Sequence, residues 1–127
     1  SAGRDRGSYD MQIDALRDRS PVPLILDVER VRWPAAVESA AYFVVAESVT
    51  NAYRHAGASQ VAVSVRTDGG VLRVRVADDG CGGAPVHDPS CLRGLRERVR
   101  SAGGTLRVVS PRGTGTTVRV DLPVGRR

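Results

Sequence analysis

The chain has 127 residues and a formal net charge of +5; apolar residues make up 41% of it, and every basic residue is an arginine. Two cysteines are too few for a disulfide framework or a cysteine-rich metal site, and no apolar run approaches the roughly 20 residues of a membrane span. The arginines are spread along the chain without interleaved aromatics, which favours solvated faces over direct contact with nucleic acid, although the positive field would also favour an anionic small ligand. We therefore expect one cytoplasmic domain without membrane contact of its own, whatever the membrane topology of a larger parent protein.

The first elements are a short helix, a strand and a long helix. Residues 8–18 predict the short helix, which Pro21 and Pro23 end. We expect residues 1–20 to be an N-terminal helix or the remnant of a linker, and residues 21–127 to be a single domain. Alternating apolar residues over 24–31 predict a strand. Residues 35–56 predict the long helix, with Pro34 in its first turn and Gly57 as its C-cap.

The second half of the chain predicts two hairpins separated by a loop and a helix. Valines at 61, 63 and 65 alternate with smaller or polar residues, and the same pattern returns over 72–76 after the turn Asp68-Gly69-Gly70. The elements that follow are a loop at 78–90, a helix at 92–102, and strands at 105–110 and 116–122 joined by a turn at 111–113. This order of elements predicts an α+β fold, a two-layer sandwich with helices packed on one face of the sheet.

The long helix carries polar residues toward its apolar side. Val37, Ala41, Val44 and Ser48 form one stripe at about 100° per residue, and Asn51 and His55 fall within or beside this stripe. Glu47 precedes Asn51 by one helix turn and shares its face. A helix end that leaves the core would explain any one of these residues. For three at successive turns, a cavity that holds a polar ligand is at least as good an explanation, because an unpaired buried polar group costs about 1–3 kcal/mol.

The chemistry of these side chains fits a magnesium–nucleotide site. The amide oxygen of Asn51 suits Mg²⁺, which prefers oxygen ligands. The carboxylate of Glu47 can orient or deprotonate a nucleophile, and Arg54 and His55 can meet phosphate oxygens.

Three glycine-containing segments extend this interpretation. Asp78 ends an apolar strand before Gly80 and Gly82, where glycines allow the backbone to approach a ligand closely and the carboxylate can accept a hydrogen bond from an exocyclic amine. Arg93-Gly94 opens the second helix, whose N-terminus can bind an anion, and residues 113–117 lead into the last strand. Each segment alone is equally a turn or a packing site, and neither the phosphate-binding P-loop nor the dinucleotide fingerprint is present.

With these pieces in order, the chain resembles the GHKL ATPase superfamily, and within it the catalytic ATP-binding domain of bacterial two-component sensor histidine kinases of the nitrate-sensor type. The resemblance covers about residues 20–123. It rests on four correctly ordered and spaced boxes: ESVTNAYRHA (47–56), VADDGCG (76–82), LRGLRERV (92–99, running to the glycines at 103 and 104) and GTGTTV (113–118).

The resemblance implies a mixed sheet covered on one face by helices, the Bergerat ATPase fold, with ATP and Mg²⁺ held between helix and sheet under a mobile lid. It implies that Asn51 binds Mg²⁺ and that Glu47 assists phosphoryl transfer. Its other implied ATP contacts are Arg54 and His55 near the phosphates, Asp78 at the adenine amine, Gly80 and Gly82 in the pocket wall, Thr116 in support of Asp78, and Arg93 and Gly94 beside the phosphates. The implied partners are a dimerisation domain that carries the phosphoacceptor histidine and a downstream response regulator.

Two departures from the family pattern bear on activity. Relatives carry Gly-x-Gly immediately before the third box, where this chain has Pro89-Ser90-Cys91, so we expect a stiffer lid hinge and weaker phosphate closure. In addition, His55 and His87 are the only histidines, and neither lies in a phosphoacceptor context, so the substrate histidine belongs to another segment.

Two alternative functions remain open at this stage. A serine kinase that inhibits a sigma factor shares the first two boxes, although the third box favours the histidine kinase. A nucleotide-binding module with impaired catalysis would explain the altered residues before the third box. A DNA-binding domain is disfavoured because no recognition helix stands out.

Overall fold

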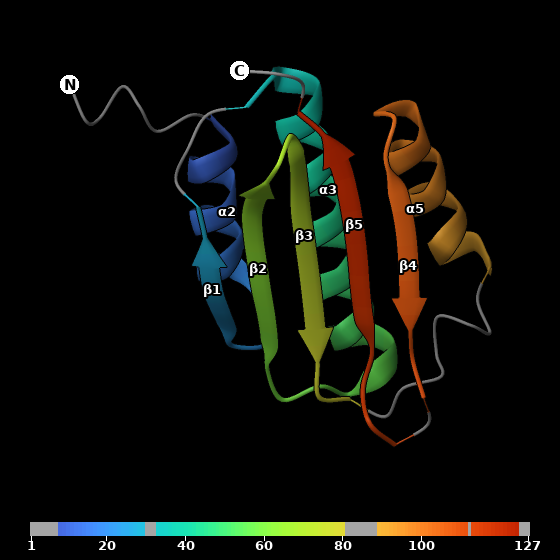
Figure 1. Cartoon of the computed structure of the whole chain (residues 1–127). Helices are drawn as coiled ribbons and strands as arrows, with labels where there is room; N and C mark the ends of the chain where they lie inside the picture. Colours follow the sequence, from blue (N-terminus) through green and yellow to red (C-terminus); the bar gives the residue numbers. More distant parts are fainter. Residues whose placement is uncertain (1–7, 30–32, 81–88, 112, 125–127) are drawn as a thin grey trace.

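The computed structural model describes residues 8–29, 33–80, 89–111 and 113–124. Its strands are β1 (Leu24–Val28), β2 (Val61–Asp68), β3 (Val71–Asp78), β4 (Thr105–Val109) and β5 (Thr117–Pro123). Its helices are α2 (Ser8–Arg19), α3 (Ala35–Asn51), the π-helical turn η1 (Ala52–Ala56) and α5 (Pro89–Ser101). The strands form one sheet, and α2, α3 and α5 lie behind it on the same face (Figure 1). The predicted α+β two-layer sandwich is therefore confirmed.

The sheet is mixed because its connections differ in length. Its order is β1-β2-β3-β5-β4, with β1 parallel to β2 and every other pair antiparallel. The chain crosses from β1 to β2 through α3, as a parallel pair requires. The turn between β2 and β3 is two glycines at positive φ, Gly69 (60°) and Gly70 (86°), which is the backbone that a tight hairpin favours.

The core lies between the sheet and the helices. Alternate residues of the strands point into it, and the opposite alternate set faces solvent, as the period of two requires. Helix α3 contributes the stripe predicted from the sequence: Val37, Ala41, Val44 and Ser48 are all buried. Helix α2 adds Ile13, which is fully buried, and Leu16. The largest buried side chains are Ile13, Leu72, Leu95 and Leu122.

Several predicted boundaries needed correction. Strand β1 ends at Val28 instead of Val31; residues 30–32 lie outside the described residues. Pro34 is the N-cap of α3 and not part of its first turn. The long helix does run to Ala56, but its last turn is π-helical, and Gly57 ends it at φ 62°, as expected of a C-cap glycine. None of the described helices is long and apolar enough to cross a membrane.

The start of α5 differs from the sequence expectation in a way that affects the site. The helix begins at Pro89, three residues before the predicted Leu92. Proline suits a first helical position, because the amide hydrogen that it lacks has no partner there. Gly94 consequently lies inside the helix and not at its N-terminus.

Candidate functional site

Most of the predicted site residues gather at one end of the sheet. Helix α3 and η1 end there, at the lower edge of Figure 1, beside the C-terminal end of β3 and the connection from β4 to β5. The end of β3 supplies Asp78, and the last turn of α3 supplies Asn51. Two segments far apart in sequence therefore bring a carboxylate and an amide to the same end of the core.

Asp78 points toward the helices and is held by the backbone around it. It has the strand parity of Leu72, Val74 and Val76, which are buried beneath the helices. Its Oδ1 accepts hydrogen bonds from the amide of Gly80 at 2.8 Å and from the amide of Thr116 at 3.3 Å. Within the described residues, its Oδ2 accepts none. The carboxylate is thus fixed in orientation and keeps one oxygen for a ligand.

The β4–β5 connection packs directly on Asp78. The amide of Asp78 donates to the carbonyl of Thr116 at 2.9 Å. Gly115 has φ 84°, and a Cβ at that position would lie 2.0 Å from the carbonyl oxygen of Asp78. Thr116 itself is buried, and its Oγ1 lies 2.6 Å from the Oγ of Ser110. The fourth box therefore packs against the end of β3 and holds it in place.

Asp79 anchors the same end of the sheet from the other side. Its carboxylate accepts hydrogen bonds from the hydroxyl of Ser59, from the amide of Ser59 at 2.8 Å and from the amide of Gln60 at 3.2 Å. These bonds lower the pKa of Asp79, with the Ser59 hydroxyl as the largest contribution. Asp79 therefore ties the segment after η1 to the end of β3, a role that the sequence did not reveal.

Helix α3 presents polar groups that have no partner in the part of the chain that the structure describes. Glu47 and Asn51 are half-buried, and neither side chain makes a hydrogen bond or ion pair within the described residues. Ser48, between them, is 5% exposed, and its Oγ has no hydrogen-bond partner there. A buried hydroxyl without a partner is uncommon and costs about 1–3 kcal/mol. This end of α3 therefore has unused capacity to bind polar atoms.

The remaining predicted site residues are exposed, lie within α5 or fall at least partly outside the described residues. Arg54 and Arg93 are exposed. Gly94 lies within α5, and a Cβ added there would meet nothing within 4 Å. The backbone of His55 belongs to η1, but its side chain lies outside the described residues, as do Gly82 and the side chains of Pro89-Ser90-Cys91. The structure thus brings Asp78, Gly80 and Thr116 into contact and leaves Arg93 and Gly94 on a separate element.

Sequence reasoning missed Ser110 and Ser48 as members of this polar end. The signal for Ser110 was present, because it continues the inward alternation of Leu106 and Val108 at the end of β4. Ser48 was visible as a hydroxyl on the apolar stripe of α3. Its lack of a partner could only come from the packed structure.

Residues 36–126 match the family model described as histidine kinase-, DNA gyrase B- and HSP90-like ATPase. The chain belongs to this family. The match begins at the second residue of α3 and includes η1, strands β2 to β5 and α5, and so contains every candidate residue above. Membership makes the domain an ATP-binding one and confirms the GHKL ATPase fold inferred from the four boxes.

Individual relatives of the domain are sensor kinases. The chain is 30% identical over 115 residues to the sensor histidine kinase LiaS of Bacillus subtilis, covering 88% of this chain and 32% of the relative. It is 28% identical over 123 residues to the sensor protein VraS of Staphylococcus haemolyticus, covering 94% and 35%. The chain therefore spans about a third of the length of these relatives.

Solved structures agree on the fold. The blue-light activated histidine kinase of Erythrobacter litoralis EL346 superposes with a TM-score of 0.75 at 29% identity, covering 90% of this chain and 40% of that one. The mycobacterial sensor histidine kinase MprB superposes with a TM-score of 0.63 at 20% identity, covering 91% of each chain. This ATPase domain is thus similar to those of histidine kinases in both sequence and fold.

Proposed function

We propose that this ATPase domain is the catalytic domain of a sensor histidine kinase. It transfers the γ-phosphoryl group of ATP to a histidine on a dimerisation domain of the same parent protein, from which a response regulator receives it. The observation that carries this proposal is the arrangement of Asp78, which holds one carboxylate oxygen on the backbone and keeps the other free at the polar end of α3. The similarity to LiaS and VraS supports the kinase reaction.

The adenine base would be recognised by Asp78. A carboxylate accepts hydrogen bonds but donates none, so it favours the exocyclic amine of adenine over the carbonyl of guanine. The bonds from Gly80 and Thr116 fix the orientation of the carboxylate before the base arrives. Because the acceptor is already ordered, little conformational entropy is lost when the base binds. Thr116 supports this contact through its backbone, and its hydroxyl is directed instead to Ser110.

The phosphates would lie toward α3 and α5. Asn51 would hold Mg²⁺ through its amide oxygen, and Glu47 would orient the attacking histidine. The fit is supported by the half-buried, unpartnered state of both side chains. When bound, Mg²⁺ neutralises charge on the transferring phosphoryl group. We assign phosphate contacts to Arg54, His55, Arg93 and Gly94, and a place in the pocket wall to Gly82.

Phosphoryl transfer requires little covalent chemistry from the protein. Phosphoryl transfer depends mainly on positioning and on charge neutralisation. The net charge of +5 provides a favourable field for a polyanionic nucleotide. A site of acceptor oxygens, arginines and a metal-binding amide is sufficient for this task.

We further propose three finer assignments. The four boxes and the short segment between Gly83 and Leu92 favour the nitrate-sensor-type subgroup. The ATP-binding domain proper is residues 21–127, and residues 1–20 carry an N-terminal helix that lies ahead of the matched family region and packs Ile13 and Leu16 into the core. The domain works in the cytoplasm, where ATP is supplied, with no direct contact to nucleic acid or membrane.

A nucleotide-binding module with impaired catalysis is the second candidate. The observation that favours it is the start of α5 at Pro89, in the stretch where the resemblance to histidine kinases implies Gly-x-Gly. Proline removes an amide donor and fixes φ, so the backbone there is less able to close on phosphates.

A phosphotransfer assay separates these candidates. The chain is mixed with Mg-ATP labelled at the γ-phosphate and with a separately prepared dimerisation domain of its own parent kinase, and acid-labile phosphohistidine is followed. We expect phosphoryl transfer by the unsubstituted 127-residue chain and none by Asn51→Ala. Arg66→Ala, whose side chain is exposed on the opposite face of the sheet and pairs with Asp27, is the matched control and should keep transfer. ATP binding without transfer by any form would favour the second candidate, and the absence of ATP binding at millimolar concentration would contradict both.

A further inference from the structure

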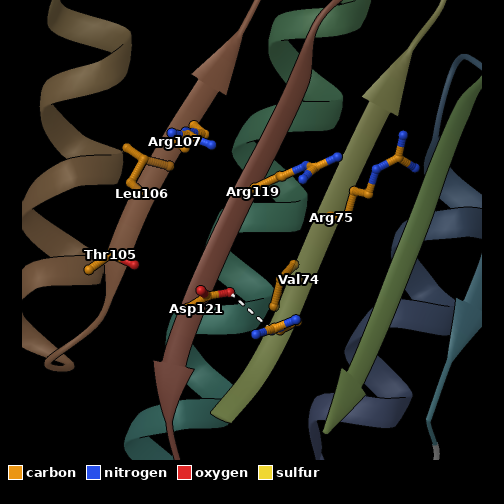
Figure 2. A pocket seen from close by; sticks show the side chains of 8 residues that line it. Val74, Arg75, Thr105, Leu106, Arg107, Arg119 and Asp121 are labelled. Carbon is orange, nitrogen blue, oxygen red and sulfur yellow. Dashed lines mark ion pairs between the residues drawn. The ribbon is translucent and has the colours of Figure 1, made fainter. Parts of the chain in front are cut away.

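The face of the sheet opposite the helices carries a hollow lined by charged side chains. Its volume is about 670 Å³, and its walls come from the three neighbouring strands β3, β5 and β4 (Figure 2). The helices pack on the other face, so this hollow is separate from the candidate ATP site. The lining residues are Arg73, Val74, Arg75, Thr105, Leu106, Arg107, Arg119 and Asp121.

Three arginines form a row across the hollow. Arg75 on β3 is directly opposite Arg119 on β5, which is directly opposite Arg107 on β4. All three are exposed, and none makes an ion pair within the described residues. We call these three residues the arginine row.

Neighbouring arginines on the same face behave differently. Arg73 pairs with Asp68 at 3.3 Å and with Asp121 at 3.8 Å, the second pair being the dashed line in Figure 2. Arg66 pairs with Asp27 at 2.6 Å. Among the described residues, Arg66 and Arg73 of this face are therefore paired with carboxylates, whereas the arginine row has no acidic partner.

The arginine row does not help the sheet to form. Side chains directly opposite on adjacent strands have Cβ atoms about 5 Å apart, and like charges in that position are destabilising. Two such pairs occur in succession here, on Arg119 with each neighbour. An external anion would relieve this repulsion, so the row is suited to binding and not to folding.

A row of small and apolar residues lies next to the arginine row, two residues further along each strand. It contains Ala77, Thr117 and Val109 opposite one another, and it continues through Ala62 to Ile25. Ile25 and Val109 at its two ends are 51% and 48% exposed. The face thus presents a positive line and a parallel apolar line.

We propose that this face docks an acidic amphipathic helix of a partner protein. Strands lie about 4.8 Å apart, so the arginine row spans about 10 Å. Residues i and i+7 of a helix are separated by a similar distance along its axis, about 10 Å. Carboxylates at i, i+3 or i+4, and i+7 therefore match the three arginines, and the apolar stripe of the same helix covers the row from Ile25 to Val109.

The composition of the face disfavours nucleic acid. Asp121 borders the arginine row on its other side, and Asp27 lies across β2 from Arg75, so a phosphate backbone would meet repulsion along with attraction. No aromatic side chain of the described residues lies in the three strands of the hollow to stack on bases. A short acidic helix can avoid both carboxylates.

The test uses a fluorescein-labelled helical peptide with glutamates at three successive turns beside a leucine stripe, titrated into the 127-residue chain. Its affinity is compared for the parent chain, for Arg119→Glu and for Arg100→Glu, which makes the same charge change on the exposed side of α5. We expect roughly tenfold weaker binding for Arg119→Glu, because one attraction is lost and one repulsion is added. Arg100→Glu should bind the peptide as tightly as the unsubstituted chain does. A peptide with glutamine in place of each glutamate should bind the unsubstituted chain about as weakly as the glutamate peptide binds Arg119→Glu.

Other outcomes overturn the proposal. These are no saturable binding up to millimolar peptide, an equal loss in both variants, or tighter binding of duplex DNA or of phosphatidylglycerol vesicles than of the peptide. Arg119→Glu should melt no lower than the parent chain, since it removes a repulsion, and that measurement excludes misfolding as the cause of a loss. Mg-ATP affinity should be the same in both variants, so the result is independent of the proposed kinase function.

Discussion

Replacing Gly115 tests the contact that supports the end of β3. In Gly115→Ala the new Cβ would lie 2.0 Å from the carbonyl oxygen of Asp78 and 3.0 Å from its carbonyl carbon. These are backbone atoms, which cannot turn aside as a flexible side chain can. Gly113→Ala is a matched control, because Gly113 has a similar φ of 81° but meets nothing within 4 Å.

The expected magnitude follows from this comparison. A left-handed backbone costs about 1–2 kcal/mol for a residue with a side chain, and this cost is common to both variants. The overlap at residue 115 adds about 1–3 kcal/mol. If the β4–β5 connection moves away to relieve it, two hydrogen bonds weaken, at about 1 kcal/mol each: the backbone bond from the Asp78 amide to the Thr116 carbonyl and the bond from the Thr116 amide to the Asp78 carboxylate. Gly115→Ala should therefore unfold with a free energy about 2 kcal/mol or more below that of Gly113→Ala.

Urea denaturation followed by circular dichroism measures this difference directly. Mg-ATP titration of the same variants should show weaker binding for Gly115→Ala than for Gly113→Ala, because the displaced Asp78 loses its fixed orientation. Equal free energies of unfolding for the two variants would refute the account of the fourth box as a support for Asp78.

Three further predictions concern single residues near the site. Gly94→Ala should raise the free energy of unfolding by about 0.5–1 kcal/mol, because the helix interior has room for the methyl group. It should also lower ATP affinity, because we assign a phosphate contact to that glycine; urea denaturation and calorimetry on one preparation would contradict this if stability and ATP affinity rose together. The lowered pKa of Asp79 in the folded state means that its stabilisation is complete above the unfolded carboxylate pKa of about 3.9 and is lost as the pH falls through the folded value. Melting temperatures taken down to about pH 2 should therefore fall less steeply for Asp79→Asn than for the parent, and parallel curves would count against the Ser59 contact. Ser48→Ala should unfold with an equal or higher free energy in the absence of nucleotide, since the hydroxyl that it removes has no partner in the described structure; a loss above about 1 kcal/mol would mean that the hydroxyl is satisfied in solution.

The sequence predicted the strands and the hairpins well because each depends on local patterns. Alternating valines and the glycine pair at 69 and 70 determine the β2–β3 hairpin without reference to the rest of the chain. The ends of helices were less predictable where tertiary packing determines them. The π-helical turn after Asn51 and the start of α5 at Pro89 have no strong signal in a periodic pattern.

The site could be predicted only in part, because its contacts join distant segments. Asp78 and Thr116 were expected to cooperate, and their hydrogen bonds are present, although the backbone amide and not the hydroxyl of Thr116 makes the contact. The hydrogen bonds that Asp79 accepts from Ser59 and Gln60 depend on the path of the segment between η1 and β2. The arginine row needs the strand register across β3, β5 and β4, which no single strand encodes.

Base selectivity tests whether Asp78 is the acceptor for the adenine amine. Mg-ATP and Mg-GTP are titrated by calorimetry against the parent chain and against Asp78→Asn, whose side chain can donate to the carbonyl of guanine. We expect the unsubstituted chain to bind ATP at least about tenfold more tightly than GTP, a difference of about 1.4 kcal/mol, and Asp78→Asn to lose most of this preference. Equal affinity of the parent chain for both nucleotides, or an unchanged preference in Asp78→Asn, would contradict the assignment of Asp78 as the adenine acceptor.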